Sequence, residues 1–277
     1  MKRFIRTDLA CERQGGIDRC EYTLHGCRVC EMSEYRGHER VCYSAVHIGA
    51  LTQMDERECG RATRAVTALL EQTATRLVQK PACVLVACLG NPRITPDSLG
   101  PCTAHSLAVT RHVQLLDAAA FARFGKGSLC LVAPGVLGDT GVESAELVRA
   151  TVREVRADLV IAVDALAASS CPHLGAVVQI CDHGLRPGAG LGNRRVAIDR
   201  DGVGCPVISL GIPTVIDSAA MICEALAQAG ICGVGKSLEA HLSRAKRYFV
   251  APGDIDALVE RGGKLLARAI GTCFGVE

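Results

Sequence analysis

Short runs of apolar residues recur from residue 82 onward and are separated by stretches with helical periodicity. The runs lie at residues 82–90, 128–135, 157–167 and 205–213. Their apolar residues are mostly continuous instead of alternating with polar ones, which is typical of strands buried on both faces of a parallel sheet. Because helical stretches lie between the runs, the pattern indicates βαβ units. We therefore predict an α/β fold with a mostly parallel sheet flanked by helices.

The stretches between these runs predict the helices. Residues 61–80 place apolar side chains such as Ala65, Leu69 and Leu77 near one side at helical spacing. Four further helices are expected, at 98–113 directly after Asp97, at 141–157 after the capping pair Asp139–Thr140, at 214–229 entered through Pro213–Thr214, and at 251–274 despite Gly262–Gly263.

The first 60 residues differ from the rest of the chain. They are polar, rich in Cys, Arg and Glu, and only weakly periodic. No internal repeat is visible, and no low-complexity linker separates these residues from the helix expected at 61–80. We predict a looser, cysteine-rich N-terminal portion over residues 1–60 and an α/β domain over 61–277.

The composition excludes several classes of protein. A chain of 277 residues with 49% hydrophobic residues can bury a sizeable core. With 31 basic and 29 acidic residues, 3% aromatics and no tryptophan, we expect no binding of nucleic acid. Charges throughout residues 1–13 rule out a secretory signal, and no uncharged run approaches the ~20 residues of a membrane span. The sequence therefore predicts a soluble cytoplasmic protein with no membrane partner.

Sixteen cysteines raise the question of disulfides or a metal. Disulfide frameworks belong to short secreted domains, and many of these cysteines lie inside apolar runs, so we expect reduced, buried thiols. Cys27 and Cys30 form one C-x-x-C pair, which has the spacing of half a zinc site. A zinc site would use Cys20, Cys27, Cys30 and Cys42. Because their spacing is irregular, this alternative stays open.

Two aspartates are the strongest candidates for chemistry. Asp97 follows the first predicted strand through a Pro- and Gly-framed turn, and Asp164 comes at the end of the run LVIAVD. Ligands of parallel sheets bind beyond the carboxyl ends of the strands. A carboxylate there is partly desolvated, which raises its pKa, and two of them can act as acid and base around one water. Aspartates at these places also commonly cap helices.

Two weaker features lie close by in the sequence. His105 and His112 are seven residues apart on the helix expected after Asp97, so they share a face where they would tune a carboxylate or bind a metal. Packed or solvated histidines are the simpler interpretation. The glycine-rich stretch 184–195 suggests a phosphate loop, but it lacks the Gly-Lys-Ser/Thr ending.

Several motifs, in one order along the chain, resemble the germination proteases of endospore-forming bacteria. The motifs are LGNPRITPDSLGP, LAVTRH, APGVLGDTGVES, VDALAASS, QICDHGLRPGAGLGNRR and LGIPTVIDS, with RTDLACE and FVAPGDIDALVE near the two ends. This family degrades small acid-soluble spore proteins when a spore germinates. It is classed as an atypical aspartic peptidase, and its fold is similar to that of hydrogenase-maturation proteases.

The resemblance implies roles for named residues. The two essential aspartates of the family fall on Asp97 and Asp164, and no cofactor is expected. A backbone cradle for an extended substrate is expected from Asn91, Gly135, Glu143, Gly188, Gly190 and Asn193. Members also resemble zymogens that remove a short pro-segment, and the matching bond here is Asp8–Leu9. A homo-oligomer such as a tetramer, located in the cytoplasm of the forespore or spore core, is implied in the same way.

The sequence also departs from the family pattern. Ser169 stands where an arginine is typical, and Arg186 stands where a histidine precedes Pro-Gly. The chain is shorter than is usual before residue 82 and between 229 and 248. Two alternatives therefore stay open: a metal-binding relative of the hydrogenase-maturation proteases, and a catalytically silent module that binds spore proteins.

Overall fold

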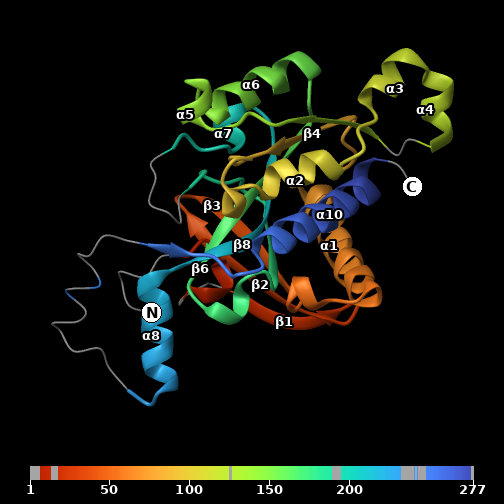
Figure 1. The fold of residues 1–277 in the computed structure, drawn as a ribbon. Coiled ribbons are helices and arrows are strands. Elements are labelled where there is room, and N and C mark those ends of the chain that lie inside the picture. Colours follow the sequence, from red (N-terminus) through yellow and green to blue (C-terminus); the bar gives the residue numbers. More distant parts are fainter. Residues whose placement is uncertain are drawn as a thin grey trace.

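A mixed sheet runs through the part of the chain that the computed structural model describes, which comprises residues 7–13, 18–124, 127–188, 195–231, 240, 242 and 248–275. Within these residues the sheet has nine strands in the order β1-β2-β3-β7-β8-β6-β4-β5, and β9 pairs with β8 (Figure 1). The strands are β1 Asp18–Leu24, β2 Cys27–Arg36, β3 Glu39–His47, β4 Cys83–Cys88, β5 Ser128–Val132, β6 Leu159–Ala168, β7 Val177–Cys181, β8 Val207–Asp217 and β9 Phe249–Val250.

The four apolar runs form the parallel part of this sheet, as the sequence predicts. They are β4, β5, β6 and β8, and the pairs β5–β4, β4–β6 and β6–β8 are all parallel. Antiparallel strands β7, β3, β2 and β1 extend the sheet beyond β8. The predicted α/β fold with a helix-flanked sheet is therefore confirmed, but the sheet is mixed and not mostly parallel. Among the described strands, three pairings are parallel and five are antiparallel, because the first 60 residues add strands of their own.

Strands β1, β2 and β3 come from the first 60 residues, where the sequence pattern predicts no strand. Nearly all of β1 is exposed, so it carries charged side chains such as Arg19 and Glu21 rather than an apolar run. The inner strands β2 and β3 are buried over much of their length, and β3 pairs with β7. The N-terminal portion thus belongs to the same sheet as the rest of the chain.

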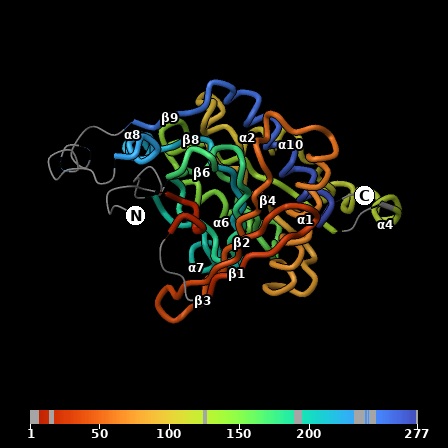
Figure 2. The backbone as a smooth tube through the Cα atoms, turned by 90° about the horizontal axis from the view of Figure 1, so that it is seen from below, coloured from red at the N-terminus to blue at the C-terminus, as the bar shows by residue number. Residues whose placement is uncertain are grey.

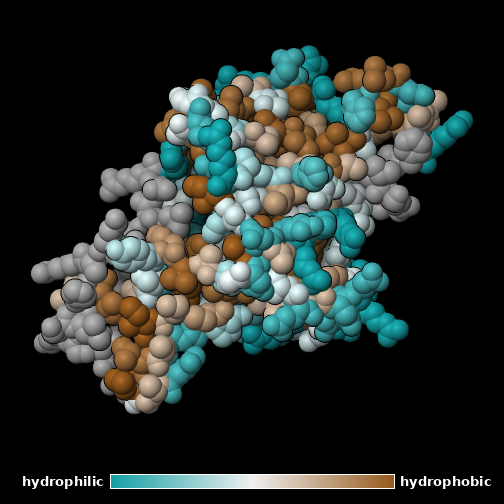
Figure 3. Space-filling view, in the orientation of Figure 1, coloured by the Kyte–Doolittle hydropathy of each residue, from teal (hydrophilic) through white to brown (hydrophobic). Residues whose placement is uncertain are grey.

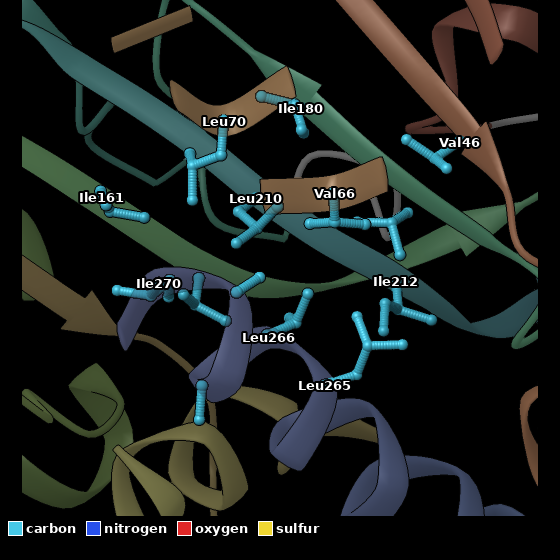
Figure 4. Close-up of a cluster of buried hydrophobic side chains, with 14 of the residues drawn as sticks. Val46, Val66, Leu70, Ile161, Ile180, Leu210, Ile212, Leu265, Leu266 and Ile270 are labelled. Carbon is cyan, nitrogen blue, oxygen red and sulfur yellow. The ribbon is translucent and has the colours of Figure 1, made fainter. Parts of the chain in front are cut away.

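Three helices cover one face of the sheet. They are α1 Glu56–Leu77, α2 Leu99–Ser106 and α10 Ile255–Phe274. Figure 4 shows side chains of α1 and α10, such as Val66 and Ile270, meeting those of the strands, such as Leu210, in the main core. The glycine pair in α10 allows this packing, because a Cβ on Gly263 would lie 2.8 Å from atoms of Cys102 in α2.

Shorter helices cover the other face and the edges. They are α3 Arg111–Leu116, α4 Ala118–Phe124, α5 Leu137–Thr140, α6 Ser144–Val155, α7 Arg200–Val203 and α8 Ser218–Gln228. Side chains of α6 such as Val148 and Val152 pack on Leu85 and Val160 in a second core cluster. Helix α8 projects from the body (Figure 1) and carries the exposed apolar residues Met221 and Ile222. An apolar area covers this helix at the lower left of Figure 3.

Several predicted helix starts are wrong. The N-terminus of α1 is capped by Asp55 in a capping box with Glu58, so the helix begins before residue 61. Asp139 and Thr140 belong to α5 and do not cap α6, whose N-cap is Glu143. Strand β8 continues through Pro213 and Thr214, so α8 begins only after its N-cap at Asp217.

The helix expected over 98–113 is also broken. Helix α2 ends at Ser106 and α3 begins at Arg111, because the backbone is extended at Leu107. His105 and His112 therefore do not share a helix face, which removes the basis for pairing them. None of the helices in the described ranges is long and apolar enough to span a bilayer.

Candidate active site

A closed turn after β4 holds Asp97 in place. The residues 95–97 form a short 3-10 helix with Pro96 in its first turn. The N–H of Asn91 donates to both the main-chain oxygen of Asp97 at 3.1 Å and its carboxylate Oδ2 at 2.9 Å. Gly90 has φ +115°, and a Cβ there would lie 1.9 Å from the Asp97 carbonyl oxygen. The turn therefore requires glycine at position 90 in order to close on the aspartate.

Strand β8 anchors the same turn from the side. The register between β6 and β8 shifts next to Leu166, so that Thr214 is an extra residue in β8. The hydroxyl of Thr214, which is fully buried, donates to the carbonyl oxygen of Pro96 at 2.7 Å. A β-bulge of this kind commonly re-aims a side chain beside an active site.

Asp164 lies within β6, just beyond the end of β4. Val163 pairs with Cys88, the last residue of β4, while β6 itself continues to Ala168. The carboxylate of Asp164 is buried, and its Oδ1 accepts a hydrogen bond from the N–H of Ala165 at 3.0 Å. The two aspartates are thus brought together at the carboxyl end of β4.

Both aspartates line the same two cavities. One cavity of about 130 Å³, here named the dyad cavity, is lined by residues that include Gly90, Asp97, Gly135, Glu143, Asp164 and Gly188. A second, of about 270 Å³, is lined by Asp97, Asp164 and mostly apolar residues such as Phe249. The two cavities are thus shared by both aspartates, and Asp8 also lines the second.

Burial controls the electrostatics of the pair. It raises the pKa of Asp164 well above the usual value, and the nearby charges of Asp97 and Asp8 raise it further. Burial also raises the pKa of Asp97, which the hydrogen bond from the N–H of Asn91 partly offsets. Two neighbouring carboxylates with raised pKa values favour a state in which one holds a proton and the other is ionised.

Four of the six residues predicted to form the backbone cradle lie at the site, and the other two lie outside the described residues. Gly135, Glu143 and Gly188 line the dyad cavity, and Asn91 contacts Asp97 through its N–H. Glu143 also caps α6, so the capping and cavity-lining interpretations hold together. Gly190 and Asn193 lie outside the described residues.

The N-terminal segment, residues 7–13, lies beside this site (Figure 2). The N–H of Asp8 donates to the oxygen of Ala167 at 2.9 Å, and the Asp8 carboxylate accepts from the N–H of Ala167 at 2.8 Å. Leu9 is fully buried in a cluster with Cys30 and Val177. Asp8 and Asp164 line one cavity of about 130 Å³, here named the segment cavity. The predicted self-cleavage bond therefore lies next to a predicted catalytic aspartate.

Glu12 fixes the far end of the segment. Its carboxylate accepts hydrogen bonds from the N–H and hydroxyl of Ser169, from Nδ1 of His173 at 2.7 Å, and from the hydroxyl of Thr7. Burial favours the protonated form, but the hydrogen bonds from His173, Thr7 and Ser169 outweigh it and lower the pKa of Glu12. Sequence reasoning missed Ser169 and His173 as partners, because no motif marks a contact with residue 12.

The four cysteines considered for zinc, all of them in the described part of the chain, do not assemble into one site. Cys27 and Cys30 are three residues apart in β2, so their side chains lie on opposite faces of the sheet. Cys27 packs in the main core, whereas Cys30 packs against Leu9. Across the residues that the structure describes, no three His, Cys, Asp or Glu side chains form a group able to hold a metal ion.

Comparisons with known proteins agree on one family. The sequence model of the family described as germination protease matches residues 29–270. The germination protease of Clostridium acetobutylicum is 34% identical over 236 residues, which cover 78% of this chain and 72% of that protein. That of Geobacillus sp. (strain WCH70) is 39% identical over 149 residues, 54% of this chain and only 40% of that protein.

A solved structure is also similar. The [NiFe] hydrogenase maturation protease HycI from Thermococcus kodakarensis KOD1 aligns with a TM-score of 0.40 and 14% sequence identity. The alignment covers 73% of this chain and 98% of that one.

Proposed function

Because this chain belongs to the germination protease family, we propose that it is an endopeptidase that hydrolyses small acid-soluble spore proteins with Asp97 and Asp164 as its acid–base pair. The observation that carries the proposal is the placement of both carboxylates on the dyad cavity, where burial raises both pKa values. A pair of this kind can activate water and protonate a leaving amine without a covalent intermediate.

The electrostatics support separate roles for the two aspartates. Burial and the charges of Asp97 and Asp8 raise the pKa of Asp164, so we assign the proton to Asp164. The hydrogen bond from the N–H of Asn91 favours the ionised form of Asp97, so we assign the role of base to Asp97. The base takes a proton from water, and the water oxygen forms a bond to the carbonyl carbon of the substrate. The C–N bond then breaks as Asp164 gives its proton to the leaving nitrogen. The products are a carboxylic acid and an amine, and a proton exchange with solvent restores the pair.

The docked N-terminal segment supports self-processing as part of this function. Leu9 and Ala10 are almost fully buried, so the segment holds the Asp8–Leu9 bond in one place beside Asp164. Removal of residues 1–8 would take away Asp8, which lines the segment cavity beside Asp164. Cleavage would thereby open the site to other peptides.

Intact-mass analysis tests the proposal. The purified chain is incubated with a small acid-soluble spore protein, with and without a chelator, beside Asp97→Asn and Asp164→Asn. We expect cleavage by the wild type alone, unaffected by chelator, with each variant slower by about 10²–10⁴-fold. Chelator-sensitive cleavage would favour the metal-dependent alternative. Binding without cleavage would show a silent spore-protein module.

The family resemblance also implies a homo-oligomer that works in the cytoplasm of the forespore or spore core, and both belong to the proposal. Sedimentation of the purified chain over a range of concentrations tests self-association. A monomer at every concentration would contradict that part alone.

A further inference from the structure

Gln179 is a buried polar side chain in the middle of an apolar strand. It is the third residue of β7, whose other members are Val177, Val178, Ile180 and Cys181. A buried amide destabilises a fold unless its polar atoms are hydrogen-bonded. Within the described residues, the Gln179 amide finds its two hydrogen-bond partners in the N-terminal segment rather than in the surrounding sheet.

The two hydrogen bonds of Gln179 go to main-chain atoms on the two sides of the Asp8–Leu9 peptide bond. Its Nε2 donates to the main-chain oxygen of Asp8 at 2.9 Å, and its Oε1 accepts from the N–H of Ala10 at 2.6 Å. The Asp8 oxygen belongs to the carbonyl of the predicted Asp8–Leu9 cleavage bond. In the flipped orientation, the Gln179 NH₂ group would face the N–H of Ala10 and its oxygen would face the carbonyl oxygen of Asp8. The partners therefore define the orientation of the amide.

The sheet register places this amide opposite Asp164. Gly211 of β8 pairs with Asp164 on one side and with Gln179 on the other. The three residues therefore form a row across β6, β8 and β7, and their positions share one face of the sheet. Gly211 has no side chain to fill the middle of the row. All three residues line the segment cavity, together with Asp8.

We propose that Gln179 is a catalytic residue that holds the scissile peptide for attack, an inference that rests on the proposed peptidase function. When water adds to the carbonyl carbon, the C=O electron pair moves to the oxygen, and the Nε2–H of Gln179 stabilises that negative charge. Arg13 Nη2 lies 3.5 Å from the same oxygen, and its positive charge adds to this stabilisation. When the C=O bond forms again, the C–N bond breaks and the nitrogen takes a proton from the aspartate pair.

The contacts explain how one site accepts both its own segment and other peptides. The two hydrogen bonds of Gln179 in the described structure go to main-chain atoms, one before and one after the bond, so any extended peptide can make the same hydrogen bonds. The Oε1 contact sets which peptide bond faces Asp164, because a shift by one residue would remove the N–H donor. A donor placed on a developing oxyanion in a site of low dielectric is worth about 10²–10³-fold in rate.

The test measures two rates for each variant. One is the first-order self-cleavage of Asp8–Leu9 followed by intact mass, and the other is kcat and KM on a small acid-soluble spore protein. Gln179→Ala removes both hydrogen bonds, whereas Gln179→Glu keeps an acceptor for the Ala10 N–H and removes the donor to the carbonyl. Val177→Ala is the matched control, because it lies on the same strand face and packs on Leu9 without touching the carbonyl.

We expect both Gln179 variants to lose about 10²-fold or more in self-cleavage rate and in kcat. Val177→Ala should change KM more than kcat. Thermal unfolding identifies variants that are damaged as a whole, and Gln179→Glu keeps the comparison possible if Gln179→Ala does not fold. Self-cleavage and kcat within a few-fold of wild type in either folded variant would overturn the catalytic role of Gln179 alone. If the wild type cuts no substrate and not itself, the peptidase function fails and this role fails with it.

Discussion

The carboxylate of Glu12 accepts two hydrogen bonds from Ser169, one from its N–H at 2.7 Å and one from its hydroxyl at 2.8 Å. Ser169 occupies the position at which the family resemblance implies an arginine. In this chain, serine takes a direct part in holding the N-terminal segment against the sheet. The carboxylate of Glu12 is therefore hydrogen-bonded with serine at this position.

Replacing Ser169 should loosen the segment. Ser169→Ala removes the hydroxyl donor to a nearly buried carboxylate, a loss of about 1–2 kcal/mol from docking. The measurement is hydrogen exchange at the amides of Leu9 and Ala10 in an Asp97→Asn background, where the segment stays intact. Exchange should become several-fold faster. Unchanged exchange would mean that Glu12 does not depend on this hydroxyl.

The same contact predicts a loss of docking in acid. The pKa of Glu12 is lowered below its usual value of 4.5 by the hydrogen bonds that it accepts from His173, Thr7 and Ser169, although burial opposes them. A group with a lowered pKa contributes its full stabilisation above the usual value and loses it as the pH falls through the folded-state pKa. The protection of the Leu9 amide, which is the slowing of its exchange relative to an unfolded peptide at the same pH, should therefore fall as the pH drops below the usual value of 4.5. Glu12→Gln should remove this pH dependence.

Replacing Asp164 of the aspartate pair should lower activity and raise stability. Burial and the neighbouring carboxylates raise the pKa of Asp164, so its contribution to folding is present at low pH and falls as the pH rises through the folded value. Asp164→Asn keeps the shape without the ionisable group. We expect it to slow cleavage by about 10²–10⁴-fold. We also expect it to raise the free energy of unfolding at pH 7, because burial and the neighbouring carboxylates disfavour the ionised form of Asp164.

Denaturant unfolding at pH 5 and pH 8 gives the check for this variant. The stabilisation by Asp164→Asn should be larger at pH 8 than at pH 5. Equal stabilities of wild type and variant at both pH values would contradict a raised pKa at this position.

Much of the parallel half of the fold could be predicted from the sequence, and little of the antiparallel half. The runs that become β4, β6 and β8 are apolar on both faces, so their pattern is visible without knowledge of their neighbours. In contrast, β1 is largely exposed, and β2 and β3 become interpretable only once their pairing with β7 is known. Charged residues on such strands hide the apolar pattern.

The candidate site shows the same division. Asp97 and Asp164 could be predicted because each follows apolar residues near a strand end, and family motifs surround both. Gln179 could not, because its role depends on two pairings of Gly211 with separate strands and on a segment from the other end of the chain. Long-range register and docking of this kind leave no local pattern.

The turn that carries Asp97 predicts a severe effect at Gly90. An alanine Cβ there would meet the Asp97 oxygen at 1.9 Å, and the backbone has φ +115°. Gly90→Ala should lower stability by about 3 kcal/mol or more and remove activity. Gly204→Ala is the control, because Gly204 has φ +91° but a Cβ there would meet no atom within 4 Å. Its smaller loss measures backbone strain alone, and equal losses would show that the contact with Asp97 adds nothing.

The Thr214 hydroxyl, which ties β8 to the Asp97 turn, should affect both stability and catalysis. Thr214→Val keeps the shape of the buried side chain and removes the donor to Pro96, leaving that carbonyl oxygen without its 2.7 Å hydrogen bond. We expect a loss of about 1–3 kcal/mol in the free energy of unfolding. We also expect a fall in kcat larger than any change in KM, because Asp97 loses its fixed pose.

Thr67 provides the matched control for this substitution. It is the buried hydroxyl on α1 that has no hydrogen-bond partner among the residues that the structure describes. Thr67→Val should therefore be neutral or stabilising by about 1 kcal/mol, since the same change removes an unsatisfied polar group. Denaturant unfolding and steady-state kinetics of the two variants provide the comparison. If both threonines respond alike, the hydrogen bond from Thr214 to Pro96 does not position Asp97, and the turn holds the aspartate through Gly90 and Asn91 alone.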